Sequence, residues 1–308
     1  MERMTLLAGT ANPVLAAALA RELGVELGGC EVRRFPDGEV DVRLTASVRR
    51  REVFVVQPTC PPVNDHLVEL LAVADACRRS AAARVVAVVP YYGYARSDKR
   101  HGRREPITAS LVAGLMEAAG IDHVLTVDLH TTQIEGFFRV PVDTLSAVPV
   151  LCEALRDRVP ADAVVVAPDA GRVALATEYA DLLDRPLVVL HKRRESGTET
   201  RVTHIVGEVR GRACVLVDDM ISTGGTIVES VGALRDAGAR PDFTVVATHG
   251  LLLRDAAARL AAAGVGTLVV TDTVPPAPSP PPGLHVVSVA PILADFIRRT
   301  AAETRDAG

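Results

Sequence analysis

Tryptophan is absent from this sequence, and aromatic residues make up only 3% of its 308 positions. Apolar residues still account for 48% of the chain, so alanine, valine, leucine and isoleucine must build most of the core. No apolar run approaches the roughly 20 residues that a membrane-spanning helix needs. The first residues carry charge at Glu2 and Arg3 and lack the apolar core of a secretory signal. The sequence therefore predicts a cytoplasmic protein of about two domains with no membrane segment.

Cysteine and lysine are scarce as well. The five cysteines are odd in number, lie far apart and form no CxxC pair, which argues against a disulfide framework and against a zinc site. A formal net charge of −4 gives no indication of a nucleic-acid partner. Of 34 basic residues, only Lys99 and Lys192 are lysines. In so arginine-rich a chain, a retained lysine reflects either chance or a position that requires a compact ammonium group.

Short apolar runs rich in β-branched residues alternate along the chain with alanine- and leucine-rich segments of helical period. This alternation predicts an α/β fold in which helices cover both faces of parallel sheets. The predicted strands include 52–57, 84–89, 123–127, 163–167, 187–190, 213–217, 243–248 and 267–270. The predicted helices include 13–23, 64–80, 108–119, 172–183 and 226–237. Three helices are expected to end at a glycine, namely Gly24, Gly120 and Gly238.

The alternation runs twice, with a break near 143–149. The sequence therefore predicts two similar α/β domains, 1–147 and 148–308. A final helix, 291–304, is expected to pack back on the first domain. The proline-rich run 275–283 predicts a stiff, solvated connection within the second domain.

Polar residues follow four of the predicted strands. Ligands of open parallel sheets collect beyond the carboxyl ends of strands, so these segments are candidates for a functional site. They are 90–99, 128–130, 168–171 and 218–220.

The segment after the strand 213–217 has the clearest chemistry. Two adjacent acids, Asp218 and Asp219, precede a Thr-Gly-Gly-Thr turn that opens a helix. Backbone N–H groups of such a turn can hold a phosphate at the helix N-terminus. The two carboxylates can reach vicinal sugar hydroxyls or a bound Mg²⁺. An acidic strand end followed by an ordinary helix cap is the alternative explanation.

The segment 215–226 resembles the loop with which phosphoribosyltransferases and ribose-phosphate pyrophosphokinases bind phosphoribosyl pyrophosphate. The resemblance implies that Asp218 and Asp219 contact the ribose hydroxyls. It also implies that the sugar phosphate lies on the five residues of the turn, which are Ser222, Thr223, Gly224, Gly225 and Thr226. This segment by itself does not distinguish the two families.

Two further segments resemble the ATP-binding segments of the pyrophosphokinases. The segment 34–39 is similar to their adenine loop, in which Phe35 would stack on the base and Asp37 and Glu39 would contact its exocyclic amine. Gly38 would belong to the same ATP-binding turn. An ordinary turn is the alternative explanation. The segment 90–98 is similar to their second ATP segment, and it implies that Arg96 and the adjacent Ser97 contact the nucleotide. A small aromatic core is the alternative here.

The segment 128–138 closely resembles the signature segment of the same family. The resemblance implies that His130 is a Mg²⁺ ligand and that Asp169 is its partner. Mg²⁺ prefers carboxylates, waters and phosphate oxygens. The assignment of His130 therefore rests on the resemblance, and a structural histidine is the alternative.

The segment 190–199 ends a predicted strand with three cations and continues with the composition of a mobile loop. A solvated basic turn would explain it by charge alone. The pyrophosphokinases carry a similar Lys-x-Arg on a flexible loop that closes over the reacting phosphates. The resemblance implies that Lys192 and Arg194 are the catalytic cations, with Arg194 also contacting ribose 5-phosphate.

The resemblance extends from Leu6 to Arg299, and the chain is identified as a member of the ribose-phosphate pyrophosphokinase family. It implies two type I phosphoribosyltransferase-like domains, and transfer of the pyrophosphoryl group of Mg-ATP to O1 of ribose 5-phosphate. The products would be AMP and 5-phosphoribosyl 1-pyrophosphate, for nucleotide biosynthesis. A homo-hexamer regulated by ADP and phosphate near Ser47 and Arg49 is also implied, with no nucleic acid or membrane partner.

The sequence departs from the family pattern at Ser97, Glu135, Ala170 and Ser222, which leaves the preferred donor nucleotide open. Two other functions remain as alternatives. A type I phosphoribosyltransferase would share the phosphate loop but would need only one such domain. A non-catalytic regulatory homologue would tolerate the loss of the metal and loop residues, which are present here. No GxxxxGK[ST] occurs, which excludes a P-loop kinase.

Overall fold

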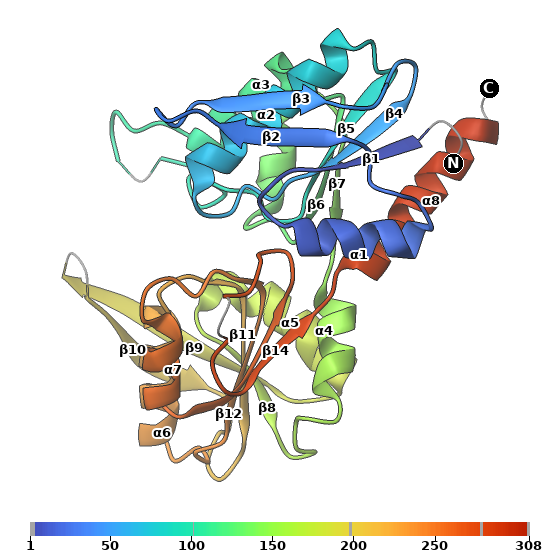
Figure 1. Ribbon diagram of the computed structural model, residues 1–308. Helices are drawn as coiled ribbons and strands as arrows, with labels where there is room; N and C mark the ends of the chain where they lie inside the picture. The colour runs from blue at the N-terminus through green and yellow to red at the C-terminus, as the bar shows by residue number, and fades with distance from the viewer. Residues whose placement is uncertain (1–3, 101, 197–198, 278–279, 307–308) are drawn as a thin grey trace. The chain divides into compact units, whose positions relative to one another are not determined.

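The computed structural model describes the backbone of residues 4–100, 102–196, 199–277 and 280–306 (Figure 1). Side chains are described for the same residues except 192–196, 199–201 and 301–306. The chain forms two compact units. Unit 1 comprises the chain up to Ser146 together with Thr273–Pro275 and the segment from Ser288 onward, and unit 2 comprises Ala147–Asp272 and Pro276–Val287.

Unit 1 is built on a five-stranded parallel sheet of order β1-β4-β5-β6-β7. Its strands are β1 (Met4–Ala8), β4 (Glu52–Val56), β5 (Arg84–Val89), β6 (His123–Val127) and β7 (Val142–Leu145). A separate antiparallel hairpin is formed by β2 (Cys30–Arg34) and β3 (Val40–Leu44). The helices are α1 (Pro13–Leu23), α2 (Val63–Arg79), α3 (Thr108–Ala118), the 3-10 helix η1 (Thr132–Phe137) and α8 (Ala290–Asp306). Helix α8 packs along α1, so the end of the chain belongs to unit 1 (Figure 1).

Helix α1 shows how the sequence determines a local element. The side chain of Asn12 accepts a hydrogen bond from the backbone N–H of Leu15 at 3.1 Å, and Pro13 occupies the first helical position, where its missing N–H costs nothing. Gly24 ends the helix in the left-handed conformation, with φ of 67°. Leucines at 15, 19 and 23 lie on one buried stripe. The predicted helix 13–23 is therefore confirmed.

Unit 2 is built on a seven-stranded sheet of order β10-β9-β8-β11-β12-β13-β14, in which only the β9–β10 pair is antiparallel. The strands are β8 (Val164–Ala167), β9 (Leu187–Ser196), β10 (Glu199–Val206), β11 (Cys214–Ile221), β12 (Phe243–Gly250), β13 (Val265–Thr271) and β14 (Leu284–Val287). Figure 1 shows α4 (Val148–Leu155) and α5 (Val173–Leu183) on one face of the sheet, and α6 (Gly225–Asp236) and α7 (Ala256–Ala262) on the other. A 3-10 turn, η2 (Ala170–Arg172), precedes α5.

The predicted α/β class is confirmed, since both units consist of a mainly parallel sheet with helices around it. The core is aliphatic, as the composition requires. On one face of the unit 2 sheet, valines and leucines of β8, β9, β11, β12 and β13 pack against Ile227, Val231 and Leu234 of α6. No helix in the described part of the chain combines the length and the apolar character that crossing a lipid bilayer requires.

One segment differs from the sequence prediction. The strand predicted at 187–190 continues as β9 to Ser196, and residues 191–196 and 199, which were predicted to form a loop, belong to the β9–β10 hairpin. A hairpin needs no apolar stripe along its whole length, because each strand satisfies the backbone groups of the other. Among the β10 residues whose side chains are described, Val202 and Ile205 pack against the core of unit 2.

Candidate active site

The acidic pair of unit 2 lies at the end of β11, directly before the glycine turn. Asp219 is buried and Asp218 is half-buried, although both are carboxylates. The turn then passes through Gly224, whose φ of 74° favours glycine, and α6 begins at Gly225. The structure thus brings the carboxylates and the N-terminus of α6 together, as a phosphate and sugar site requires.

The turn itself is open toward solvent at two of its hydroxyls. Thr223 and Thr226 are exposed, and Ser222 is half-buried. The guanidinium of Arg259 on α7 donates a hydrogen bond to the carbonyl oxygen of Thr223 at 3.2 Å. The backbone N–H of Leu253 donates to the carbonyl of Ser222 at 2.9 Å. The loop after β12 and helix α7 therefore support the turn.

Arg172, which sequence reasoning did not select, neutralises part of the acidic pair. Its Nε donates a hydrogen bond to Asp218 Oδ1 at 2.8 Å, and its Nη2 lies 2.8 Å from Asp219 Oδ1. Burial raises the pKa of Asp218 well above its usual range, and the carboxylate of Asp219 raises it further. The positive charge of Arg172 acts in the opposite direction and lowers that pKa.

Asp169 follows β8 and caps the short turn that leads to Arg172. Its Oδ1 accepts a hydrogen bond from the backbone N–H of Gly171 at 2.8 Å, and the side chain is half-buried. A half-buried aspartate is a suitable Mg²⁺ ligand, because Mg²⁺ takes one or two protein carboxylates and completes its shell with waters and substrate phosphates. No cluster of three His, Cys, Asp or Glu side chains arranged for a metal occurs in the described residues.

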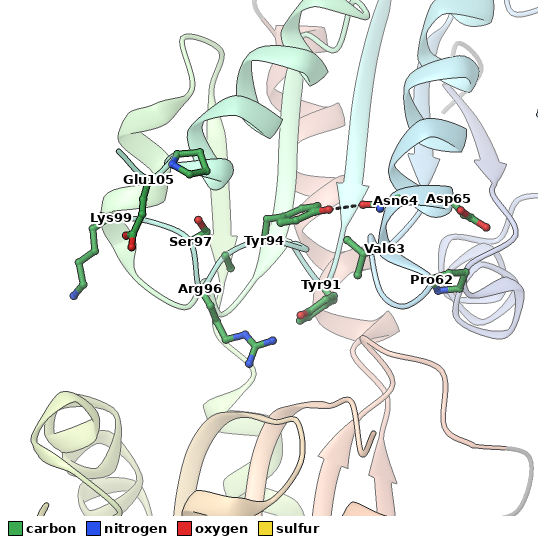
Figure 2. A pocket seen from close by; sticks show the side chains of 12 residues that line it. Pro62, Val63, Asn64, Asp65, Tyr91, Tyr94, Arg96, Ser97, Lys99 and Glu105 are labelled. Atoms are coloured by element: carbon green, nitrogen blue, oxygen red, sulfur yellow. Dashed lines mark hydrogen bonds between the residues drawn. The ribbon is translucent and has the colours of Figure 1, made fainter. Parts of the chain in front are cut away.

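Unit 1 contains a cavity of about 700 Å³ at the carboxyl end of β5. It is lined by Arg96 and Ser97, as predicted for a nucleotide site, and also by Lys99. In Figure 2 the side chains of Lys99 and Glu105 lie to one side of Tyr94, and Asn64 lies to the other. The hydroxyl of Tyr94 donates a hydrogen bond to Asn64 Oδ1. The cavity thus combines an aromatic ring with cations that suit a phosphorylated aromatic ligand.

The segment that contains His130 is connected to the segment 90–99 by a buried carboxylate, that of Asp98. Asp98 is only 4% exposed, and its Oδ2 accepts hydrogen bonds from Thr131 Oγ1 at 2.8 Å and from Gln133 Nε2 at 2.7 Å. The end of β5 and the end of β6 are thereby tied together. His130 is half-buried beside Thr131. His130 belongs to unit 1 and Asp169 to unit 2, so the predicted metal pair stays a prediction.

The predicted adenine loop is the turn of the β2–β3 hairpin. The N–H of Phe35 donates to the carbonyl of Glu39 at 2.8 Å, and the N–H of Glu39 donates to Asp37 Oδ1 at 3.1 Å. Gly38 has a φ of 95°, which favours glycine in this turn. The ring of Phe35 is 52% exposed and is available for stacking. None of these four residues lines the 700 Å³ cavity, although Arg34 at the end of β2 lies 3.4 Å from the carboxylate of Asp65, which does line it.

The two predicted catalytic cations lie on β9, where the backbone is described but the side chains are not. Lys192 pairs with Val202 of β10 and Arg194 pairs with Thr200 in the antiparallel register. Their side chains lie outside the described residues, and their roles stay predictions.

Several residues of the site were not selected from the sequence. Lys99 carried a signal, because it is one of only two lysines, and the structure places it on the 700 Å³ cavity. Arg172 carried none, because it is one of many arginines and meets its partners 46 residues later in the chain. Asn64 and Tyr94 could have been found only from the packing of α2 against the turn after β5.

Comparison with known proteins identifies the family. Residues 4–120 match the model of the N-terminal domain of ribose phosphate pyrophosphokinase, and residues 198–305 match that of the phosphoribosyl synthetase-associated domain. A ribose-phosphate pyrophosphokinase of Bradyrhizobium diazoefficiens is 44% identical over 97% of this chain and 95% of its own length. One of Caldanaerobacter subterraneus is 45% identical over 96% of this chain and 94% of its own length.

A solved structure agrees with these sequence matches. The phosphoribosylpyrophosphate synthetase of Mycobacterium smegmatis is similar with a TM-score of 0.90 and 43% identity, over 98% of this chain and 99% of its own. Identity at this level over nearly the whole length exceeds what a shared fold alone produces. The chain therefore belongs to the ribose-phosphate pyrophosphokinase family.

Proposed function

We propose that the protein transfers the pyrophosphoryl group of Mg-ATP to O1 of ribose 5-phosphate. O1 attacks the β-phosphorus, the bond from that phosphorus to the α–β bridging oxygen breaks, and AMP leaves with that oxygen. The proton of the anomeric hydroxyl goes to solvent or to the phosphate of the departing AMP. The observation that carries the proposal is the acidic pair at the end of β11 followed directly by the N-terminus of α6, in a chain that belongs to this family.

The sugar phosphate would bind in unit 2. Backbone N–H groups of the turn 222–226 and the hydroxyls of Thr223 and Thr226 would hold the 5-phosphate, because the N-terminus of a helix attracts anions. Asp218 and Asp219 would accept hydrogen bonds from the ribose hydroxyls, since ionised carboxylates are acceptors only. The buried position of the pair supports this role, because hydrogen bonds to desolvated charges are strong.

The nucleotide would bind in unit 1. Arg96 would pair with its phosphates, and Ser97 lines the same cavity. The exposed ring of Phe35 would stack on adenine, Asp37 and Glu39 would contact its exocyclic amine, and Gly38 would shape the turn that presents them. Lys99 adds a second cation to the cavity, which makes the electrostatic potential there more positive and so favours a polyphosphate.

His130 and Asp169 would hold the Mg²⁺ ion. When bound, the ion supplies positive charge that neutralises the phosphate oxygens. The protein groups then act by positioning. Lys192 and Arg194 would contact the transferring phosphates from the β9–β10 hairpin, and Arg194 would also contact ribose 5-phosphate. Such positioning and charge compensation are what phosphoryl transfer requires, and no covalent protein intermediate is needed.

The family resemblance extends the proposal beyond the single chain. We infer a cytoplasmic homo-hexamer that serves nucleotide biosynthesis and responds to ADP and phosphate near Ser47 and Arg49. The backbone N–H of Arg49 donates to Ser47 Oγ at 3.4 Å, so the two residues share one turn.

The test is an incubation of the purified protein with ATP, ribose 5-phosphate, Mg²⁺ and phosphate, with AMP and phosphoribosyl pyrophosphate measured together. Equimolar release of the two products is expected, with loss in Lys192→Ala while ATP binding persists. A folded protein that releases no AMP under any condition would be the non-catalytic homologue instead. Release of pyrophosphate from phosphoribosyl pyrophosphate and a nucleobase would indicate a phosphoribosyltransferase.

A further inference from the structure

A single guanidinium bridges the two adjacent carboxylates at the end of β11. Arg172 uses two nitrogens of one edge of its fork, Nε for Asp218 and Nη2 for Asp219, and both distances are 2.8 Å. Neighbouring side chains of a strand normally point to opposite faces. Two consecutive carboxylates held by one planar group therefore have restricted orientations, which a lysine ammonium on a flexible stem would not impose.

The contact is mostly removed from solvent. The side chain of Arg172 is 19% exposed, that of Asp218 is 13% exposed and that of Asp219 is 6% exposed. Ion pairs on an open surface contribute little to stability, but the loss of one partner from a buried pair leaves an uncompensated charge. Here the loss of Arg172 would leave two carboxylates, on consecutive residues, without the cation that bridges them.

The bridge engages one oxygen of each carboxylate. Both contacts of Arg172 are to Oδ1, and Asp218 Oδ1 also accepts a hydrogen bond from the backbone N–H of Asp219 at 2.9 Å. The Oδ2 atoms take no part in the bridge. We propose that Arg172 is a positioning residue, which fixes both carboxylates so that their second oxygens are directed at the vicinal hydroxyls of the ribose.

This inference rests on the proposed function, because it takes Asp218 and Asp219 as the groups that bind the sugar hydroxyls. The other titratable groups on neighbouring elements are Asp169, which caps the turn before Arg172, and His249, which is buried on β12 opposite Met220. Neither is one of the charges that shift the pKa of Asp218, which are Asp219 and Arg172.

The experiment compares Arg172→Gln and Arg172→Lys with Arg240→Gln. Arg240 forms an ion pair with Asp162 on the exposed surface of the same unit, so its loss controls for the removal of an arginine. Steady-state kinetics with each substrate varied in turn are measured for each variant. Circular dichroism and thermal melting establish that each variant is folded.

For Arg172→Gln we expect KM for ribose 5-phosphate to rise about 100-fold, which corresponds to about 2.8 kcal/mol at 1.4 kcal/mol per factor of ten. KM for ATP should stay within about twofold, because the nucleotide cavity lies in unit 1. Arg172→Lys should recover part of the loss, and Arg240→Gln should match the wild type. A merely structural cross-link would instead lower the melting temperature and leave the KM for ribose 5-phosphate unchanged.

The pH dependence of kcat/KM is a second measurement, which tests whether Arg172 acts on the carboxylates during the reaction. Arg172 lowers the pKa of Asp218, so its removal raises that pKa, and the acidic limb of kcat/KM should shift to higher pH in Arg172→Gln. If Arg172→Gln is not folded, the test relies on Arg172→Lys. The inference is overturned if that variant has the wild-type KM for ribose 5-phosphate and the acidic limb of its kcat/KM profile is not shifted.

Asp218→Asn and Asp219→Asn separate this inference from the proposed function. If both raise the KM for ribose 5-phosphate and Arg172→Gln does not, the carboxylates bind the sugar but Arg172 does not position them. If neither Asn variant changes that KM while products still form, the sugar lies elsewhere, and both the placement of the substrate and the role of Arg172 are wrong.

Discussion

The carboxylate of Asp98 accepts a hydrogen bond from the hydroxyl of Thr131 at 2.8 Å, although 33 residues separate the two. Asp98 follows the segment that lines the nucleotide cavity, and Thr131 follows His130. Two segments that the sequence selected independently are thus connected by one buried acceptor, which also receives Gln133 Nε2 at 2.7 Å.

We predict that Asp98→Ala lowers both stability and activity. The change leaves two donors without their acceptor, which costs about 1–3 kcal/mol in the free energy of unfolding. It also removes the connection between the segment that contains Arg96 and the segment that contains His130, so kcat should fall about tenfold, as expected when groups are displaced from the reacting geometry. Urea denaturation and steady-state kinetics measure the two effects.

The matched variant Asp98→Asn keeps the shape and one carbonyl oxygen. Both donors meet the same oxygen, Oδ2, so an asparagine oriented by them retains both hydrogen bonds. Its kcat should stay within about threefold of the wild type, since only the charge is lost. Equal damage in the alanine and asparagine variants would mean that Asp98 acts through its charge and not as an acceptor.

The sequence predicted the buried parts of this fold better than the exposed ones. Strands such as β5, buried along almost their whole length, produce an apolar run that is visible in the sequence. The strands β2 and β3 alternate half-buried with exposed positions and are rich in charge, and β14 is only four residues long. Their pairing depends on partners elsewhere in the chain, so no local pattern predicted them.

In the candidate site, too, local motifs were predicted from the sequence and contacts between distant segments were not. Asp218, Asp219 and the glycine turn were found because their order along the chain is itself the motif. Arg172 was not, because its role comes from a contact between the segment after β8 and the end of β11. Contacts of this kind arise from strand order, which places β8 beside β11 in the sheet.

We predict that Glu69→Leu destabilises unit 1. Glu69 is fully buried, and its carboxylate accepts the backbone N–H of Thr10 at 2.5 Å and the hydroxyl of Thr10 at 2.6 Å. An apolar replacement removes both hydrogen bonds, and because Thr10 is exposed and water can take the place of the lost acceptor, the loss is about 0.5–1.5 kcal/mol for each bond. Urea denaturation should show the loss, and Glu153→Gln, in an exposed pair with Arg156, should change stability by less than about 0.5 kcal/mol.

The thiols of the folded protein should resist alkylation. Burial raises the pKa of Cys60 to about 11 and the pKa of Cys77 and Cys152 to about 12. Since the thiolate is the reactive form, little of it exists at pH 8. Iodoacetamide should therefore label the native protein slowly and all five cysteines rapidly in denaturant, as counted by mass spectrometry. Rapid labelling of Cys60 in the native state would contradict its burial.

Replacement by alanine should change the stability of the protein in opposite directions at Gly224, which precedes α6, and at Gly232, which lies within it. Gly224 has a φ of 74°, and a Cβ there would lie 3.3 Å from the side chain of Leu260. Gly224→Ala should therefore cost about 1–2 kcal/mol of stability, the scale of strain for a left-handed residue. It should also raise the KM for ribose 5-phosphate, because the turn that holds the phosphate must shift.

Gly232 lies within α6, and a Cβ there would meet nothing within 4 Å. Gly232→Ala should stabilise the protein by about 0.5–1 kcal/mol, since alanine loses less backbone freedom than glycine on entering a helix. Its kinetics should remain those of the wild type. Thermal melting of both variants gives the comparison. If Gly224→Ala also stabilises the protein and leaves the KM for ribose 5-phosphate unchanged, the turn does not require the left-handed conformation, and its role as a rigid phosphate cradle is wrong.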